Sequence, residues 1–217
     1  MSQESDALAD LLGRPNLPSP LFVMLAGSNG AGKSTFYDAY LDSLALPFIN
    51  ADRIAAELRA EARILPQELS SLPADRAAQG IADEERHASI VLRRSFVTET
   101  VFSDPVGAKV AMLNAARARG FEVWFFFIGI GSSELSHARV RERVSSRGEH
   151  DVSAAKIRAC YARTLRNLPG AIEAASIAVL LDNDLADAPY RFVALFENGS
   201  LVRSSELAPE WAKAVLR

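Results

Sequence analysis

The fold of this 217-residue chain is decided by the stretch Leu21-Phe22-Val23-Met24-Leu25-Ala26-Gly27-Ser28-Asn29-Gly30-Ala31-Gly32-Lys33-Ser34-Thr35. Residues 21–26 are all apolar, and a short, wholly apolar run is typical of a strand buried on both faces of a parallel sheet. Residues 33–44 carry apolar side chains at helical spacing, which predicts a helix. A glycine-rich turn therefore joins a buried strand to a helix.

That turn fits the pattern G-x-x-x-x-G-K-[ST], which cradles the phosphates of a nucleoside triphosphate when it lies between a strand and a helix. Glycines let the backbone curl so that successive N–H groups face an anion, and the following helix adds the positive end of its dipole. We expect Lys33 to reach the β- and γ-phosphates and Ser34 to bind Mg²⁺. The residues expected to bind ATP are Gly27, Ser28, Asn29, Gly30, Ala31, Gly32, Lys33, Ser34 and Thr35.

Other nucleotide-binding signatures narrow the class of protein. The chain has neither the Asn-Lys-x-Asp sequence of a guanine-specific site nor the Leu-Ser-Gly-Gly signature of an ABC-type ATPase. Asp182 ends the apolar run 177–181 and resembles the acidic, metal-binding residue of a Walker B strand. A strand that simply passes into a turn at Asp182 is the simpler interpretation, and the sequence leaves both open.

The rest of the chain alternates between the two kinds of segment. Strands are predicted at 46–49, 95–102, 122–130 and 176–181, and helices at 51–62, 74–94, 105–119, 132–146 and 153–168. Asn198-Gly199 predicts a tight turn within a hairpin over 191–203. We expect a three-layer α/β fold with a mainly parallel sheet, formed by one domain over residues 1–217 in which residues 1–20 are an N-terminal extension.

Composition excludes several classes of protein. Apolar residues make up 49% of the chain and charged residues 24%, which rules out a mainly disordered chain, and the one cysteine cannot form an intramolecular disulfide. The apolar run 123–128 is too short to span a bilayer. With a net charge of −3, we expect a cytoplasmic protein that binds neither nucleic acid nor membranes.

The charge is unevenly distributed. Residues 139–166 hold eight basic and three acidic side chains, a local charge of +5 that leaves −8 on the rest of the chain. Arg139, Arg143 and Arg147 recur at every fourth residue, and like charges at that spacing on a helix repel one another unless an anion lies beside them. We predict that residues 131–168 form an Arg-rich helical lid over the transferring phosphoryl group, although a solvated helix face would show the same pattern.

Two carboxylates are predicted at the carboxyl ends of strands, where α/β folds place their ligands. Asp52 follows the second strand and Glu99 lies late in the third, directly before Thr100. A carboxylate near the γ-phosphate can accept the proton of an attacking hydroxyl. The alternatives are that Asp52 serves the N-terminus of a helix and that Glu99 forms an ion pair at the strand end.

Taken together, these residues resemble the zeta-toxin family of P-loop kinases, and in particular its short single-domain branch. The resemblance runs from about Phe22 to Val202. Besides the glycine-rich loop, it rests on Asn50-Ala51-Asp52, Glu99-Thr100-Val101-Phe102-Ser103, Arg139-Val140-Arg141-Glu142-Arg143-Val144, Arg147-Gly148-Glu149-His150-Asp151-Val152, Ile157-Arg158, Tyr161-Ala162-Arg163-Thr164-Leu165-Arg166-Asn167-Leu168 and Leu181-Asp182-Asn183.

The resemblance implies an activity and a set of roles. Well-studied zeta toxins phosphorylate a hydroxyl of the amino sugar in UDP-N-acetylglucosamine and are held inactive by a small antitoxin. On this basis Asp52 is the expected base, Glu99 and Thr100 lie by the acceptor, and Arg143, Arg147 and Arg158 are lid cations. The chain departs from the usual pattern at Glu149 and at Ala159-Cys160, which removes positive charge from the lid.

Three functional hypotheses follow from the sequence. The first is an ATP- and Mg²⁺-dependent kinase that phosphorylates a small hydroxyl acceptor such as a nucleotide sugar. The second is an NTP-binding or NTP-hydrolysing regulatory protein under the control of a partner. The third is a P-loop kinase with another acceptor class, such as a nucleotide or an antibiotic.

Overall fold

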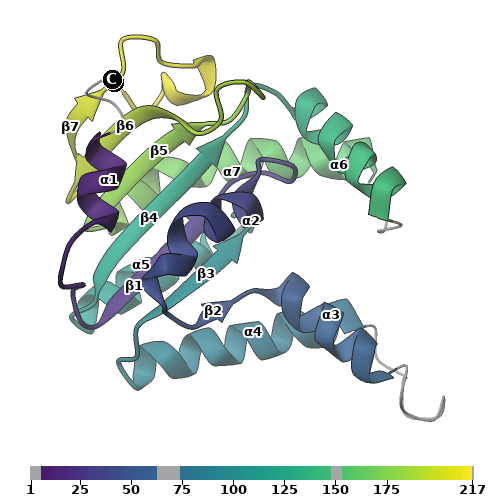
Figure 1. Cartoon of the computed structure of the whole chain (residues 1–217), viewed down its shortest axis with the longest axis horizontal. Helices are drawn as coiled ribbons and strands as arrows, with labels where there is room; N and C mark the ends of the chain where they lie inside the picture. Colours follow the sequence, from purple (N-terminus) through teal and green to yellow (C-terminus); the bar gives the residue numbers. More distant parts are fainter. Residues whose placement is uncertain (1–5, 63–73, 148–152, 217) are drawn as a thin grey trace.

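A seven-stranded sheet forms the centre of the molecule (Figure 1), seen in a computed structural model that describes residues 6–62, 74–147 and 153–216. Its strands run in the order β2-β3-β1-β4-β5-β6-β7. The first five strands in this order are parallel to one another. Strand β6 is antiparallel to β5, and β7 is antiparallel to β6. The bounds are β1 (Leu21–Ala26), β2 (Phe48–Ile49), β3 (Phe96–Thr100), β4 (Glu122–Gly129), β5 (Ile177–Asp182), β6 (Arg191–Glu197) and β7 (Ser200–Ser204). The predicted α/β fold with a mainly parallel sheet is confirmed.

Helices cover both faces of this sheet (Figure 1). They are α1 (Asp6–Leu12), α2 (Lys33–Phe36), α3 (Ala51–Ala62), α4 (Ala74–Val91), α5 (Ala108–Ala118), α6 (Ser133–Arg147) and α7 (Ala154–Ala174). The helix predicted over 33–44 forms as α2 followed by a π-helical turn, η1 (Tyr37–Leu41), and a 3-10 turn, η2 (Asp42–Leu44). Residues 148–152, which include most of the predicted turn between the lid helices, lie outside the described residues.

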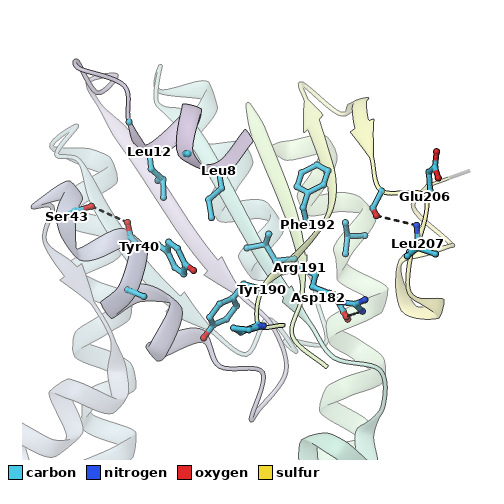
Figure 2. Close-up of a pocket in the computed structure, with 17 residues that line it drawn as sticks. Leu8, Leu12, Tyr40, Ser43, Asp182, Tyr190, Arg191, Phe192, Glu206 and Leu207 are labelled. Carbon is cyan, nitrogen blue, oxygen red and sulfur yellow. Dashed lines mark hydrogen bonds and ion pairs between the residues drawn. The ribbon is translucent and has the colours of Figure 1, made fainter. Parts of the chain in front are cut away.

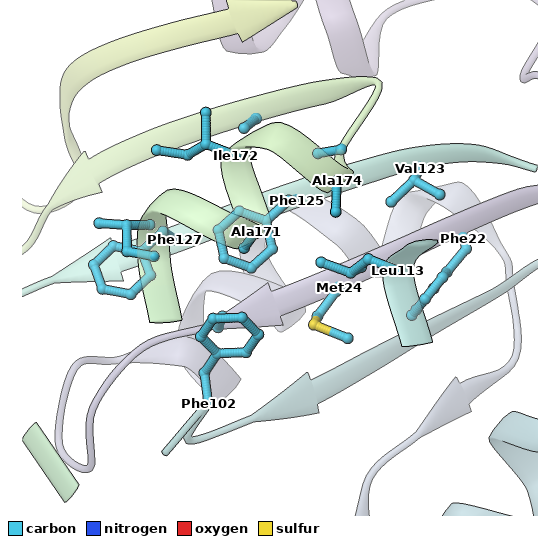
Figure 3. Packing of buried hydrophobic residues seen from close by; sticks show 14 of the residues in the cluster. Phe22, Met24, Phe102, Leu113, Val123, Phe125, Phe127, Ala171, Ile172 and Ala174 are labelled. Atoms are coloured by element: carbon cyan, nitrogen blue, oxygen red, sulfur yellow. The ribbon is translucent and has the colours of Figure 1, made fainter. Parts of the chain in front are cut away.

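The apolar residues of β1 supply two hydrophobic cores because successive side chains point to opposite faces of a sheet. Phe22 and Met24 face a core formed with α4, α5 and α7 (Figure 3), while Val23 and Leu25 face a core formed with α1, α2 and η1. All six side chains of β1 are buried. The sequence pattern of a strand covered on both sides is therefore confirmed, and the loop after β1 starts from a rigid base.

Helix α7 continues past the predicted end of the lid. The sequence predicted that this helix ends at Leu168, before Pro169, but the helix extends to Ala174 with Pro169 in its interior. Proline costs the helix a hydrogen bond, and the burial of Ala171 and Ile172 against the sheet compensates for that loss. Helix α7 contacts α5, β4 and β5, so its C-terminal half is part of the fold core and not of a mobile lid.

The predicted N-terminal extension contains a helix, α1, that the sequence pattern does not predict. Helix α1 buries Leu11, and Leu8 and Leu12 pack beside it on the second core. With only seven residues, α1 shows too few apolar repeats for its periodicity to be recognised. Within the described ranges, no helix combines the length and the apolar character needed to cross a membrane.

Candidate active site

The glycine-rich loop, residues 27–35 and hereafter the P-loop, needs glycine for two separate physical reasons. A Cβ on Gly27 would lie 2.3 Å from the carbonyl oxygen of Ile128, so the backbone of β4 approaches too closely for a side chain. Gly32 has a φ of +90°, a left-handed conformation that other residues adopt at a cost, and a Cβ there would lie 2.5 Å from Asn183 Nδ2. The loop therefore keeps its shape only with glycine at these positions.

Lys33 begins α2 and is buried, with only 7% of its side chain exposed. Its Nζ donates a hydrogen bond to the carbonyl oxygen of Ser28 at 3.1 Å and lies 3.7 Å from Glu99 Oε1. Burial lowers the pKa of Lys33 below its ordinary value, and the negative charges of Glu99 and Asp52 oppose this shift. The ammonium group thus lies against the loop backbone and within ion-pair distance of Glu99.

Glu99 is brought to the P-loop because β3 pairs with β1, placing Glu99 opposite Leu25 in the register. Glu99 Oε2 accepts hydrogen bonds from Ser34 Oγ and from Asn50 Nδ2, each at 3.0 Å. Asn50 also caps α3, since its Oδ1 accepts the backbone N–H of Asp52 at 2.8 Å. No role for Asn50 is predicted from the sequence, although Asn50-Ala51-Asp52 is part of the family resemblance.

Asp52 is exposed in the first turn of α3 and lines a cavity of about 470 Å³ beside the P-loop. Glu99 and Thr100 line the same space, so the structure brings together the three residues that the sequence placed near an acceptor. Thr100 Oγ1 accepts the N–H of Phe102 at 3.0 Å, which turns the chain at the end of β3. The lining residues are Asn29, Asn50, Ala51, Asp52, Gln79, Arg86, Glu99, Thr100, Val101, Phe102, Ser103, Asp104, Lys109, Lys156 and Cys160.

The arginines of the lid segment differ in their surroundings. The Arg139 guanidinium donates hydrogen bonds to the carbonyl oxygens of Asn183 at 2.8 Å and Asp184 at 3.1 Å. Arg139 therefore joins α6 to the segment that follows β5. Arg143 is exposed, and its charge contributes to the lowered pKa of Lys33, behind the larger effect of burial. Arg158 is exposed on α7. Arg147 ends α6, and its side chain lies outside the described part of the structure.

Asp182 is buried at the end of β5 and faces the C-terminal segment. Its Oδ2 accepts a hydrogen bond from Arg191, and its Oδ1 accepts one from Trp211 Nε1 at 3.0 Å. Both carboxylate oxygens are therefore engaged by protein groups, whereas Glu99 lies beside Ser34. The Walker B-like interpretation of Asp182 is replaced by a structural role, and the carboxylate nearest the predicted metal ligand comes from β3.

Replacing Asp182 with Asn is expected to lower the free energy of unfolding by about 1–2 kcal/mol, because it loses the ion pair with the partly exposed Arg191. ATP affinity should not change. Urea unfolding and equilibrium ATP binding measure the two effects, with Asp187→Asn in the following exposed loop as the control. A variant of normal stability whose nucleotide binding is no longer strengthened by Mg²⁺ would restore the metal-binding interpretation.

A P-loop between β1 and α2 of a mainly parallel sheet, with a carboxylate from the adjacent strand beside its Lys and Ser, defines a P-loop NTPase fold. The chain belongs to the zeta toxin family, whose sequence model matches residues 6–184. An uncharacterized protein of Haemophilus influenzae is 30% identical over 128 residues, which are 58% of this chain and 82% of the relative.

Solved structures share the fold at low sequence identity. The crystal structure of AvrRxo1-ORF1:AvrRxo1-ORF2 with sulphate ions aligns with a TM-score of 0.67 and 17% identity over 90% of this chain. This chain spans 63% of that AvrRxo1 chain. The same complex has been solved with ATP, with a TM-score of 0.60 and 16% identity over 90% of this chain and 63% of that one. A structure of the PezAT chromosomal toxin-antitoxin system of Streptococcus pneumoniae aligns with a TM-score of 0.53 and 16% identity, over 97% of this chain and 85% of that one.

Proposed function

We propose that this chain is an ATP-dependent kinase, acting as one domain, that transfers the γ-phosphate to a hydroxyl group of a small molecule. The observation that carries the proposal is the cavity of about 470 Å³ in which Asn29 of the P-loop meets Asp52, Glu99 and Thr100. One residue of the proposed donor loop and a carboxylate able to accept a proton thus border the same space. That is the minimum arrangement for phosphoryl transfer, which depends mainly on position, charge and a base.

The donor is proposed to be ATP. The P-loop offers backbone N–H groups, the N-terminus of the helical segment beginning with α2, and the ammonium group of Lys33, all suited to a triphosphate. The related AvrRxo1 complex, solved with ATP, supports this assignment. Arg143, whose charge reaches Lys33, would add a cation over the transferring phosphoryl group, and Arg147 and Arg158 are proposed to do the same.

Ser34 and Glu99 fit a Mg²⁺ ion, because Mg²⁺ prefers oxygen ligands and these two side chains lie 3.0 Å apart, Oγ to Oε2, beside Lys33. When bound, the ion would neutralise charge on the β- and γ-phosphates. Lys33 holds the Glu99 carboxylate from one side and Asn50 holds it from another, which fixes its orientation. Ser34 is therefore retained as a proposed metal ligand, and Glu99 is proposed beside it.

For the acceptor, we propose a nucleotide sugar of the UDP-N-acetylglucosamine type. Asp52 would accept the proton of the attacking hydroxyl, and Glu99 and Thr100 border the space where that hydroxyl would lie. Lys156 also lines this space and favours an acceptor that carries phosphate groups. Arg86 and Lys109 line it too, but both are paired with Asp83. Membership of the zeta toxin family supports the same acceptor class.

We also propose that a small antitoxin protein controls this kinase. The support is comparative: the AvrRxo1 structures are complexes of two gene products, and PezAT is a toxin-antitoxin system. Co-purification of the chain with the product of a neighbouring reading frame, followed by a kinase assay of the complex, tests this. Full activity in the complex would contradict control by that partner.

A screen of acceptors with ATP labelled at the γ-phosphate tests the kinase assignment. The panel contains UDP-N-acetylglucosamine, other nucleotide sugars, nucleotides and hydroxyl-bearing antibiotics, with a reaction lacking any acceptor as the control. We expect the label on a nucleotide sugar only. Label on a different acceptor would correct the acceptor class alone. Release of inorganic phosphate without an acceptor, and no labelled product, would overturn the kinase and favour an NTP-hydrolysing regulatory protein.

A further inference from the structure

Four consecutive carbonyl groups of the P-loop, those of residues 29–32, are hydrogen-bonded by side chains from other parts of the chain. The donors are Ser136 Oγ to Asn29 O at 2.6 Å, Arg139 Nη1 to Gly30 O at 3.5 Å, Asn183 Nδ2 to Ala31 O at 2.8 Å and Tyr190 OH to Gly32 O at 2.9 Å. Ser136 and Arg139 are on α6, whereas Asn183 follows β5 and Tyr190 precedes β6. We call these four side chains the carbonyl brace.

The direction of these carbonyl groups determines the direction of the N–H groups. In a planar trans peptide, the N–H of one residue points opposite to the C=O of the residue before it. Holding the carbonyls of residues 29–32 on the outer side of the loop therefore turns the N–H groups of residues 30–33 to the inner side. Among these N–H groups, that of Ala31 already donates to Ser28 O at 3.2 Å. A carbonyl rotated inward would direct its lone pairs at the phosphates.

Glycines make this bracing necessary. Gly30 and Gly32 give the P-loop the freedom to curl, and the same freedom lets its peptide groups rotate when nothing holds them. The space beside both glycines is tight: a Cβ on Gly30 would lie 3.0 Å from Arg139 Cβ, and one on Gly32 would lie 2.5 Å from Asn183 Nδ2. The loop is thus enclosed by α6 and by the segment between β5 and β6.

We propose that the carbonyl brace positions the P-loop for phosphate, so that Ser136, Arg139, Asn183 and Tyr190 set nucleotide affinity without touching the nucleotide's phosphates. This inference rests on the proposed function, since it requires the P-loop to bind ATP. An orientation held before binding removes the entropic cost of ordering the loop on the ligand. Through Ser136 and Arg139, the brace also connects the N-terminal part of α6 to the P-loop.

Tyr190 allows the most selective test because only its hydroxyl belongs to the brace. Its ring packs edge-on against Phe36, with the centroids 5.1 Å apart, and against Tyr40 at 5.9 Å. Figure 2 shows Tyr190 at the lower end of a separate cavity of about 880 Å³, below Leu8 and Leu12 of α1. Tyr190→Phe keeps these ring contacts and removes the side-chain bond to Gly32 O, together with a hydrogen bond shared with Thr35. The backbone bond from the N–H of Phe36 to Gly32 O, at 3.0 Å, stays in place.

Tyr161→Phe is a matched control. The Tyr161 hydroxyl donates to a backbone carbonyl, that of Ile130, at the same distance of 2.9 Å, and Tyr161 is also partly buried. Ile130 lies outside the P-loop. A second pair compares Asn183→Ala with Asn167→Ala, because Asn167 likewise donates through its Nδ2 to backbone carbonyls, those of Phe102 and Asp104, at 3.0 Å.

The experiment measures equilibrium binding of Mg²⁺·ATP and of Mg²⁺·tripolyphosphate to the full chain and its variants, with thermal unfolding without ligand alongside. Loss of one brace hydrogen bond should weaken both ligands by the same factor, about five- to tenfold for Tyr190→Phe and Asn183→Ala. Tyr161→Phe and Asn167→Ala should bind both ligands as the parent chain does. Equal weakening of tripolyphosphate and of ATP would locate the effect in the phosphate-binding loop and not in contacts with the adenine base.

Each outcome decides the inference. If the parent chain binds ATP and Tyr190→Phe and Asn183→Ala bind as tightly as their controls, the brace is wrong and the proposed function stands. Weakening of ATP without weakening of tripolyphosphate would also overturn the brace. Failure of the parent chain to bind either ligand would overturn the proposed function, and the brace with it. A fall in unfolding temperature that is equal for brace and control variants, with unchanged affinity, would leave these residues a structural role only.

Discussion

Replacing Asp52 with Asn is expected to slow phosphoryl transfer by about 10²- to 10⁴-fold, the usual contribution of a general base. ATP affinity should stay within about threefold, because the phosphate-binding groups of the P-loop are untouched. Asp52 is exposed and its backbone N–H, not its carboxylate, is held by Asn50, so the fold does not depend on its charge. Single-turnover measurements with excess enzyme separate the transfer step from binding.

Asp75→Asn is the control for this substitution. Asp75 occupies the first turn of α4 just as Asp52 occupies the first turn of α3, so both changes remove the same favourable charge–dipole interaction. Asp75 pairs with Arg59 and is not among the residues that line the cavity of about 470 Å³ beside the P-loop. Normal transfer by Asp75→Asn and slow transfer by Asp52→Asn would support the base. Equal rates for the two variants would show that Asp52 only serves its helix.

Replacing Gly129 with Ala is expected to destabilise the fold by about 3–5 kcal/mol, comparable to removing a buried aromatic side chain. A Cβ on Gly129 would lie 2.2 Å from the ring of Trp211, which is 7% exposed and packs directly on the backbone of β4. The ring would have to leave this position, also losing its hydrogen bond to Asp182. Since native domains are stable by only about 5–15 kcal/mol, urea unfolding should show a large fall in midpoint.

Gly80→Ala is the matched control. Gly80 lies on the exposed face of α4, and a Cβ there would have no heavy atom within 4 Å. Alanine in a helix is favoured over glycine by about 1 kcal/mol, so this variant should be slightly more stable than the parent. Combining Gly129→Ala with Trp211→Ala identifies the cause: the glycine substitution should cost much less once the ring is absent. Full additivity of the two changes would contradict the contact.

Local patterns were sufficient to predict much of the fold and part of the candidate site. The apolar run of β1, the P-loop and the alternation of strands with helices each depend on neighbouring residues, and each is confirmed in kind. Asp52, Glu99 and Thr100 were expected at strand ends, and they line one cavity. Their roles stay predictions until the variants are measured.

Other features depend on which distant segments meet. Asp182 ends β5 and Glu99 lies next to the end of β3, so their positions in the sequence look alike. Only the strand order shows that β3 carries Glu99 to Ser34 while Asp182 meets Trp211. Arg139 looked like a lid cation from its spacing, yet its guanidinium holds backbone carbonyls after β5. The spacing of the arginines cannot predict the partners of Arg139, because these carbonyl groups lie far from Arg139 in the chain.

The sequence by itself determined that this chain has a buried parallel strand, a P-loop that needs its glycines, and an excess of positive charge over residues 139–166. Each of these follows from the chemistry of residues close together in the chain. Only the tertiary structure decided which carboxylate accompanies Ser34 and which side chains hold the P-loop carbonyls. The physical reason is that such hydrogen bonds form between segments as many as 158 residues apart, and packing of the two cores sets their distances.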